Sequence, residues 1–126
     1  MKKKPARKLV FSTLDPQKRT VYFYDDTWEH IKKEHPEVRG GSTRHRDVKG
    51  IRTIRSTVED PLTITHDQTR NALSYADYTT SGLYFKVIAK IDDKANVCTV
   101  STAYLTPDQP KGSVIWQQNK AKRRKS

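Results

Sequence analysis

Short runs rich in β-branched and aromatic residues fill most of the chain after residue 60, and they predict strands. Turn-forming pairs such as Asp92-Asp93 and Lys111-Gly112 separate these runs. The links are too short for helical crossovers, so neighbouring strands should pair antiparallel. The predicted strands are Thr20 to Tyr24, Leu62 to Thr65, Ala72 to Tyr78, Leu83 to Ile91, Val97 to Thr106 and Ser113 to Trp116.

A short helix is predicted from Thr27 to His35. Asp26 followed by Glu29 resembles a capping box at its start, and Pro36 biases His35 out of the α region and ends it. A second helix is predicted where aliphatic residues recur at helical spacing beside a row of basic ones. Its aliphatic positions are Val48, Ile51, Ile54 and Val58, and its adjacent basic face carries Arg46, Lys49 and Arg52.

These elements predict an α+β fold in which one or two N-terminal helices pack on a four- to five-stranded antiparallel sheet. With 126 residues and 33% hydrophobic residues, the chain has room for one domain, expected at 9–116. No apolar run approaches the about 20 residues of a membrane span, and the basic start leads into no signal-peptide core. We therefore expect a cytoplasmic protein without a membrane partner.

Most of the net charge of +11 lies at the two ends of the chain. Residues 1–8 and 117–126 contain ten basic residues and no acidic ones, which leaves 15 basic and 14 acidic residues between them. Such basic tails attract polyanions such as RNA by counterion release, without reading sequence. The alternative is that they only keep the protein soluble. In the C-terminal tail the candidate nucleic-acid contacts are Lys122, Arg123 and Arg124.

The domain itself holds a second basic stretch between residues 39 and 55, with six basic residues against one acid. A solvated helix face is the ordinary interpretation of such a run, and a phosphate-binding surface is the functional one. The candidate contacts are Arg44, Arg46, Lys49, Arg52 and Arg55.

Two histidines lie in the first predicted helix, at positions 30 and 35. At helical spacing His35 falls on the side of Trp28 and Ile31, and His30 on the opposite side. Zinc-binding histidines on a helix are four residues apart, whereas these are five apart, so we expect no metal and no cofactor here. The single cysteine, Cys98, excludes a multi-cysteine metal site. His35 is then either a general acid or base or a structural core histidine.

Lys86 stands in the middle of a predicted strand, where a cation is costly unless it meets a phosphate, a carboxylate or solvent. The next strand places Thr102 and Tyr104 on one face. A hydroxyl in the middle of a sheet is commonly structural, so these residues alone do not establish a site.

Three segments together carry a family resemblance: W-E-H-I-K-K-E-H-P-E at 28–37, I-R-S-T-V-E-D-P at 54–61, and V-S-T-A-Y-L-T with G-S-V-I-W between 100 and 116. They resemble the phage- and mobile-element-associated domains grouped with barnase, EndoU, colicin and RelE-like nucleases (the BECR fold). The resemblance implies a metal-independent endoribonuclease, in some systems a toxin countered by an inhibitor or immunity protein. It singles out His30, His35, Thr102 and Tyr104. Leu105 departs from the family pattern, in which proline is expected.

Metal-free cleavage of RNA needs a base for the 2′-hydroxyl, an acid for the leaving 5′-oxygen, and cations or donors for the phosphorane. His35 is the expected acid or base and His30 its expected partner. Lys86 and an arginine from residues 44–55 are the expected electrostatic clamp, with Thr102 and Tyr104 as donors. Two alternatives remain open. One is a non-catalytic nucleic-acid-binding module, and the other is an interaction protein such as an antitoxin or a phage-encoded inhibitor.

Overall fold

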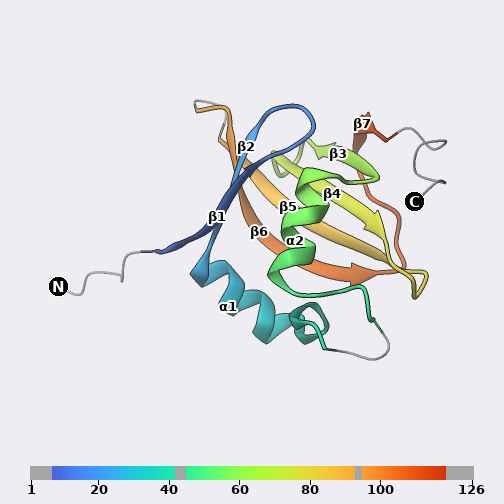
Figure 1. Cartoon of the computed structure of the whole chain (residues 1–126). Coiled ribbons are helices and arrows are strands. Elements are labelled where there is room, and N and C mark those ends of the chain that lie inside the picture. Colours follow the sequence, from blue (N-terminus) through green and yellow to red (C-terminus); the bar gives the residue numbers. More distant parts are fainter. Residues whose placement is uncertain (1–6, 42–44, 93–94, 119–126) are drawn as a thin grey trace.

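A computed structural model describes residues 7–41, 45–92 and 95–118, and these form one sheet with helices on one side (Figure 1). The described elements are, in order, β1 (Leu9–Leu14), β2 (Thr20–Tyr24), α1 (Asp25–Glu34), the 3-10 helix η1 (Pro36–Arg39), α2 (Ile51–Glu59), β3 (Thr63–Asp67), β4 (Ala72–Tyr78), β5 (Tyr84–Asp92), β6 (Val97–Thr106) and β7 (Ser113–Gln117).

The sheet of the described residues has seven strands in the order β1-β2-β6-β5-β4-β3-β7. The pair of β2 and β6 is parallel and short, joining Thr20 to Tyr22 with Val97 to Thr99. The other neighbours pair antiparallel. The predicted four- to five-stranded antiparallel sheet behind N-terminal helices is therefore wrong, because the sheet is larger, mixed, and begins with two strands that precede both helices.

The strand β1 was not predicted from the sequence, and it directly follows the predicted basic tail. Its sequence L-V-F-S-T-L pairs with β2, and Phe11 is buried with its ring centroid 5.2 Å from that of Phe23. Both helices and three strands lie between β2 and β6 in the chain. The chain therefore has room to return to the start of β2, and β6 runs beside it in the same direction. The pairing of β2 with β6 leaves no local signal in the sequence, whereas β1 and β2 are consecutive strands joined by residues 15–19.

The predicted bounds of β2, β4 and β6 are confirmed, as is the end of α1. His35 has φ −135° and ψ 69°, outside the helical region, as its place before Pro36 requires. The start of α1 is two residues earlier than predicted. The Asp25 backbone N–H donates to the Lys8 carbonyl at 2.9 Å, which joins the helix start to the chain before β1.

The second helix begins later than its aliphatic spacing predicts. Gly50 has φ 65°, and a Cβ there would lie 2.8 Å from the Arg39 carbonyl oxygen, so the chain turns sharply before α2. Arg46 and Lys49 consequently precede the helix, and the predicted basic helical face of three residues is wrong. Of those three, Arg52 alone lies on α2.

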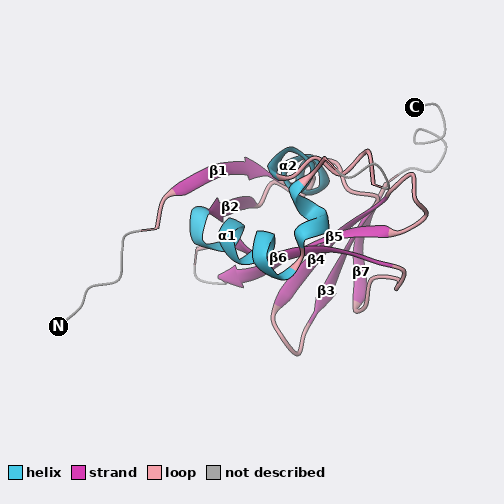
Figure 2. Ribbon diagram, turned by 90° about the horizontal axis from the view of Figure 1, so that it is seen from below, coloured by secondary structure: helices cyan, strands magenta, loops and turns pink. Residues whose placement is uncertain are grey.

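The helices lie on one side of the sheet, as Figure 2 shows from below. The hydrophobic core contains buried residues of both helices and of one face of the sheet. Alternate residues of β5, namely Phe85, Val87 and Ala89, are buried against Ile31 of α1 and Ile54 of α2. The opposite face of the sheet, here called the open face, carries the remaining residues of each strand. The candidate site is on this face.

Candidate active site

The register of β5 and β6 brings three of the predicted site residues onto the open face. Lys86 is directly opposite Tyr104, and Ile88 is directly opposite Thr102. Since side chains alternate along a strand, Thr102 and Tyr104 lie two residues apart on the same side as Lys86. The sequence predicted the two faces of each strand, and the pairing of the strands places the three side chains together.

His35 reaches this group from the end of α1. Its ring centroid lies 5.4 Å from that of Tyr104, with the ring planes tilted by 33°, and its side chain is 34% exposed. The contact is possible because β2 pairs only with the first residues of β6. Beyond Thr99 the edge of β6 is flanked by α1 and η1 instead of a strand, so a side chain at the helix end can meet the open face.

The other histidines lie elsewhere. His30 is exposed on the outward side of α1, as its helical phase predicted. His45 contacts the Ser81 hydroxyl at 3.0 Å, and His66 in β3 contacts Asn71 at 3.5 Å. Of the four histidines, all within the described part of the chain, His35 alone contacts Tyr104. The expected pairing of His30 with His35 in one site has no support in the geometry.

Lys86 is 5% exposed although it lies on the open face. The connection from β6 to β7 covers it: β7 pairs with β3, three strands beyond β6, so residues 107–112 must cross the sheet. The Lys86 ammonium donates to the Gln109 carbonyl of this crossing segment at 3.1 Å. Burial lowers the pKa of Lys86, partly opposed by Asp108, while Lys111 lowers it further. Lys86 therefore meets a backbone carbonyl, a partner that the sequence did not predict.

A single glycine marks where the crossing segment meets the sheet. Gly112 has φ 101°, and a Cβ there would lie 2.4 Å from the His66 carbonyl oxygen of β3. No larger residue fits this approach. In the sequence Gly112 cannot be distinguished from an ordinary turn glycine, so it does not by itself predict a segment that crosses the sheet.

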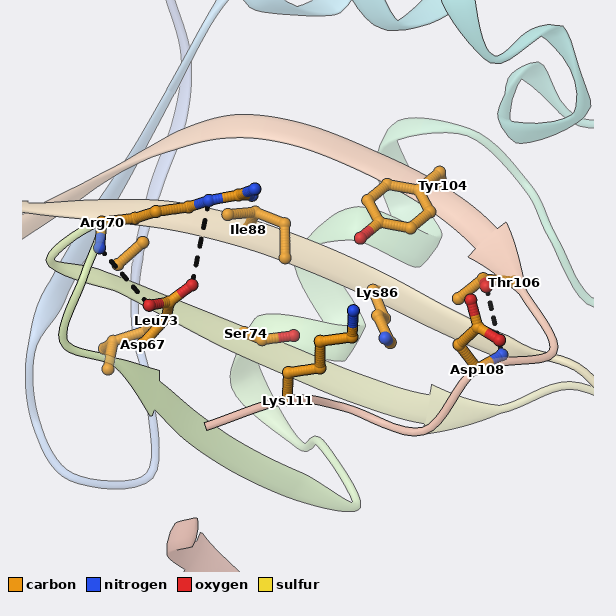
Figure 3. A pocket seen from close by; sticks show the side chains of 11 residues that line it. Asp67, Arg70, Leu73, Ser74, Lys86, Ile88, Tyr104, Thr106, Asp108 and Lys111 are labelled. Carbon is orange, nitrogen blue, oxygen red and sulfur yellow. Dashed lines mark hydrogen bonds and ion pairs between the residues drawn. The ribbon is translucent and has the colours of Figure 1, made fainter. Parts of the chain in front are cut away.

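A pocket of about 280 Å³ opens beside Lys86 and Tyr104, between the crossing segment and β4 to β6 (Figure 3). The ammonium groups of Lys86 and Lys111 and the hydroxyl of Tyr104 turn toward the same space. Further polar and charged groups line it, and Arg70 lies 3.9 Å from the Asp67 carboxylate. These remaining polar residues are Asp67, Arg70, Ser74, Thr106 and Asp108.

Three buried hydroxyls at this face lack hydrogen-bond partners among the described residues: Thr65 in β3, Ser74 in the pocket wall, and Thr102 two residues from Tyr104. In register order Thr65, Ser74, Ile88 and Thr102 form one row across β3, β4, β5 and β6. Unpaired buried hydroxyls are uncommon in proteins, and a bound polar ligand is one way to satisfy them. Thr102 thus lies on the same face as Tyr104, and its hydroxyl has no hydrogen-bond partner among the described residues.

The predicted nucleic-acid contacts lie apart from this pocket. Arg46, Lys49, Arg52 and Arg55 are all exposed. Arg52 and Arg55 lie on the outward side of α2, which covers the opposite face of the sheet, and Arg55 pairs with Glu59 at 3.0 Å. The predicted contacts Arg44, Lys122, Arg123 and Arg124 lie outside the described residues.

Within residues 7–41, 45–92 and 95–118, no group of three or more His, Cys, Asp or Glu side chains is arranged to hold a metal ion. None of the described helices has the length and the apolar run of a membrane-spanning segment. Comparisons of the chain with protein-family models, with curated proteins and with solved structures found no match.

Proposed function

We propose that this chain is a metal-independent endoribonuclease that cleaves RNA in the cytoplasm through attack of the 2′-hydroxyl. The observation that carries the proposal is the contact of His35 with Tyr104, which itself lies opposite Lys86 on the open face. The His35 imidazole contacts the Tyr104 phenol, and the Lys86 ammonium group comes from the strand opposite Tyr104. The three groups would supply the base, the hydrogen-bond donor and the cation that this reaction requires.

In the proposed reaction His35 takes the proton of the 2′-hydroxyl while the 2′-oxygen bonds to the adjacent phosphorus. The bond from phosphorus to the 5′-oxygen breaks, leaving a 2′,3′-cyclic phosphate. The leaving 5′-oxygen takes a proton from the Lys86 ammonium, whose pKa is lowered by burial and which is therefore a better acid than an ordinary lysine. Tyr104 and Thr102 donate hydrogen bonds to the phosphorane oxygens.

The direct test compares two alanine variants of the same helix. His35→Ala should lower the rate of cleavage of a fluorescent RNA by about 10²-fold or more. His30→Ala is the matched control, since it makes the same change at an exposed position of α1 away from Tyr104. Equal activity of the two variants, with equal thermal midpoints, would refute the role of His35.

The products and the effect of chelator test the mechanism itself. Cleavage should persist in excess EDTA and yield 2′,3′-cyclic or 3′-phosphate ends, and DNA and 2′-O-methyl RNA should resist it because they lack the nucleophile. Inhibition by EDTA together with 3′-hydroxyl ends would place the chain in a metal-dependent class.

A second candidate function is RNA binding without cleavage, and the observation that favours it is the charge of the two tails. Removal of residues 1–8 and 117–126 should weaken binding to single-stranded RNA. The slope of log affinity against log salt should fall by roughly 0.7 for each phosphate that the shortened protein no longer neutralises. An unchanged slope would show that the tails do not bind the phosphates. Binding by the full chain with no cleavage at all would favour this candidate over the nuclease.

A further inference from the structure

Two tyrosines form a stacked pair at the end of the hairpin of β4 and β5. The ring centroids of Tyr78 and Tyr84 are 4.6 Å apart with planes 28° from parallel, and their hydroxyls are 2.9 Å apart in a hydrogen bond. Tyr78 is 54% exposed. One side of an aromatic pair is thus presented to solvent instead of the core.

The pair lies on the open face, one row away from the candidate active site. Tyr78 is opposite Tyr84, and Tyr84 is opposite Thr106. The next row on the same face contains Lys86 and Tyr104. Two residues along a strand correspond to about 7 Å, so the aromatic pair directly neighbours the groups proposed to bind the scissile phosphate.

The turn that joins the two strands is held in place by a contact from outside the hairpin. The Thr79 backbone N–H donates to the Leu83 carbonyl at 2.9 Å. The Asp47 carboxylate accepts from the backbone N–H of Thr80 at 2.9 Å and from its hydroxyl at 3.2 Å. The aromatic pair is therefore attached to a braced turn, and little ordering is needed when a ligand stacks on it.

The charge beside the pair favours a polyanion over an apolar peptide. Lys86 and Lys111 line the adjacent pocket. Exposed aromatic rings beside cations are the arrangement that binds single-stranded nucleic acid, because bases stack on the rings while cations neutralise phosphates.

We propose that Tyr78 and Tyr84 form a stacking platform for a base of single-stranded RNA next to the scissile phosphate. This inference rests on the proposed function, since it assigns the substrate strand a place on the same face. A purely structural role is the competing explanation, because cross-strand aromatic pairs also stabilise hairpins. The two explanations differ in whether binding depends on the presence of a base.

The experiment measures binding of strands that cannot be cleaved. One probe is a fluorescent 2′-O-methyl oligouridine, and the other is a strand of equal length and charge in which abasic residues replace the uridines. Wild-type protein should bind the oligouridine about tenfold more tightly than the abasic strand, a preference typical of base stacking on aromatic side chains. Fluorescence anisotropy at fixed salt gives both dissociation constants.

Three variants then isolate the ring of Tyr78. Tyr78→Leu and Tyr78→Thr remove the aromatic ring and should abolish the preference for the oligouridine, with affinity for the abasic strand unchanged. Tyr78→Phe keeps the ring and removes the hydroxyl, so it should retain the preference. Circular dichroism establishes that each variant is folded, and two non-aromatic replacements guard against one failing to fold.

A preference that survives in both non-aromatic variants would overturn the proposal, as would the absence of any preference in the wild-type protein. Equal weakening for both strands would also overturn it, because the ring would then act through the fold or the phosphates. Failure of the nuclease proposal is recognised separately: wild-type protein would leave ordinary RNA intact, while the binding of uncleavable strands would still give a result.

Discussion

Replacement of Tyr104 by phenylalanine separates the two roles that the site assigns to this residue. The ring contacts His35, and the hydroxyl turns into the pocket beside Lys86. Phenylalanine keeps the ring, so the aromatic contact, of a kind worth about 0.5–1.5 kcal/mol, should remain. We therefore expect the free energy of unfolding of Tyr104→Phe to stay within about 0.5 kcal/mol of wild type.

The catalytic effect should be far larger than the effect on stability. Loss of one donor to a developing oxyanion costs about 2.7–4 kcal/mol in known cases, which is about 10²–10³-fold in kcat. Tyr104→Ala should lose at least as much activity and also about 1–3 kcal/mol of stability, because it removes a half-buried ring from the side of His35. The two variants together separate the contribution of the Tyr104 hydroxyl to activity from that of its ring.

The assay is single-turnover cleavage of a fluorescent RNA at saturating enzyme, with urea unfolding measured on the same preparations. Full activity of Tyr104→Phe would refute the donor role. If only Tyr104→Ala lost activity, Tyr104 would be a positioning residue for His35. In that case the pH dependence of cleavage should shift in Tyr104→Ala and not in Tyr104→Phe.

Three further predictions concern buried groups. Tyr75→Phe removes a hydroxyl that donates to the buried Asp15 carboxylate at 2.7 Å, and should lower the urea-unfolding free energy by about 1.5–3 kcal/mol; an unchanged midpoint would contradict this. Burial raises the pKa of Cys98 to about 11, so its thiol should resist iodoacetamide at pH 8 until the protein unfolds, and rapid labelling of folded protein would refute the burial. Burial lowers the pKa of Lys86 below its ordinary value of 10.5, so below that pH the folded state binds fewer protons at this group than the unfolded state does. The stability gained as the pH rises toward 10.5 should therefore be smaller in Lys86→Met. Parallel pH profiles of wild type and variant would contradict that effect.

Local patterns in the sequence determined several elements and the two faces of each strand. The bounds of β2, β4 and β6 follow from runs of β-branched and aromatic residues. The helix α1 ends at Glu34 because His35 precedes a proline and cannot adopt the helical conformation. The burial of Phe85, Val87 and Ala89 on one side of β5 follows from its period of two. These features are predictable because they depend on neighbouring residues and on chain stereochemistry alone.

The candidate site was predicted in part for the same reason. The phase of α1 placed His35 on its packed side and His30 on its exposed side, and the alternation of β6 placed Thr102 and Tyr104 together. The resemblance suggested His30 as a partner for His35, and the geometry gives that pairing no support. Helical phase, a local property, was here the better guide to which side chains can meet.

Only the tertiary structure decided which strands pair and which side chains therefore lie side by side. The parallel pair of β2 and β6 and the segment that crosses the open face to β7 join residues far apart in the chain. So do the contacts of His35 with Tyr104 and of Lys86 with Gln109. Strands of similar composition can pair in many orders, and the choice among them depends on how the whole core is buried, a property of the complete fold that no short stretch of sequence contains.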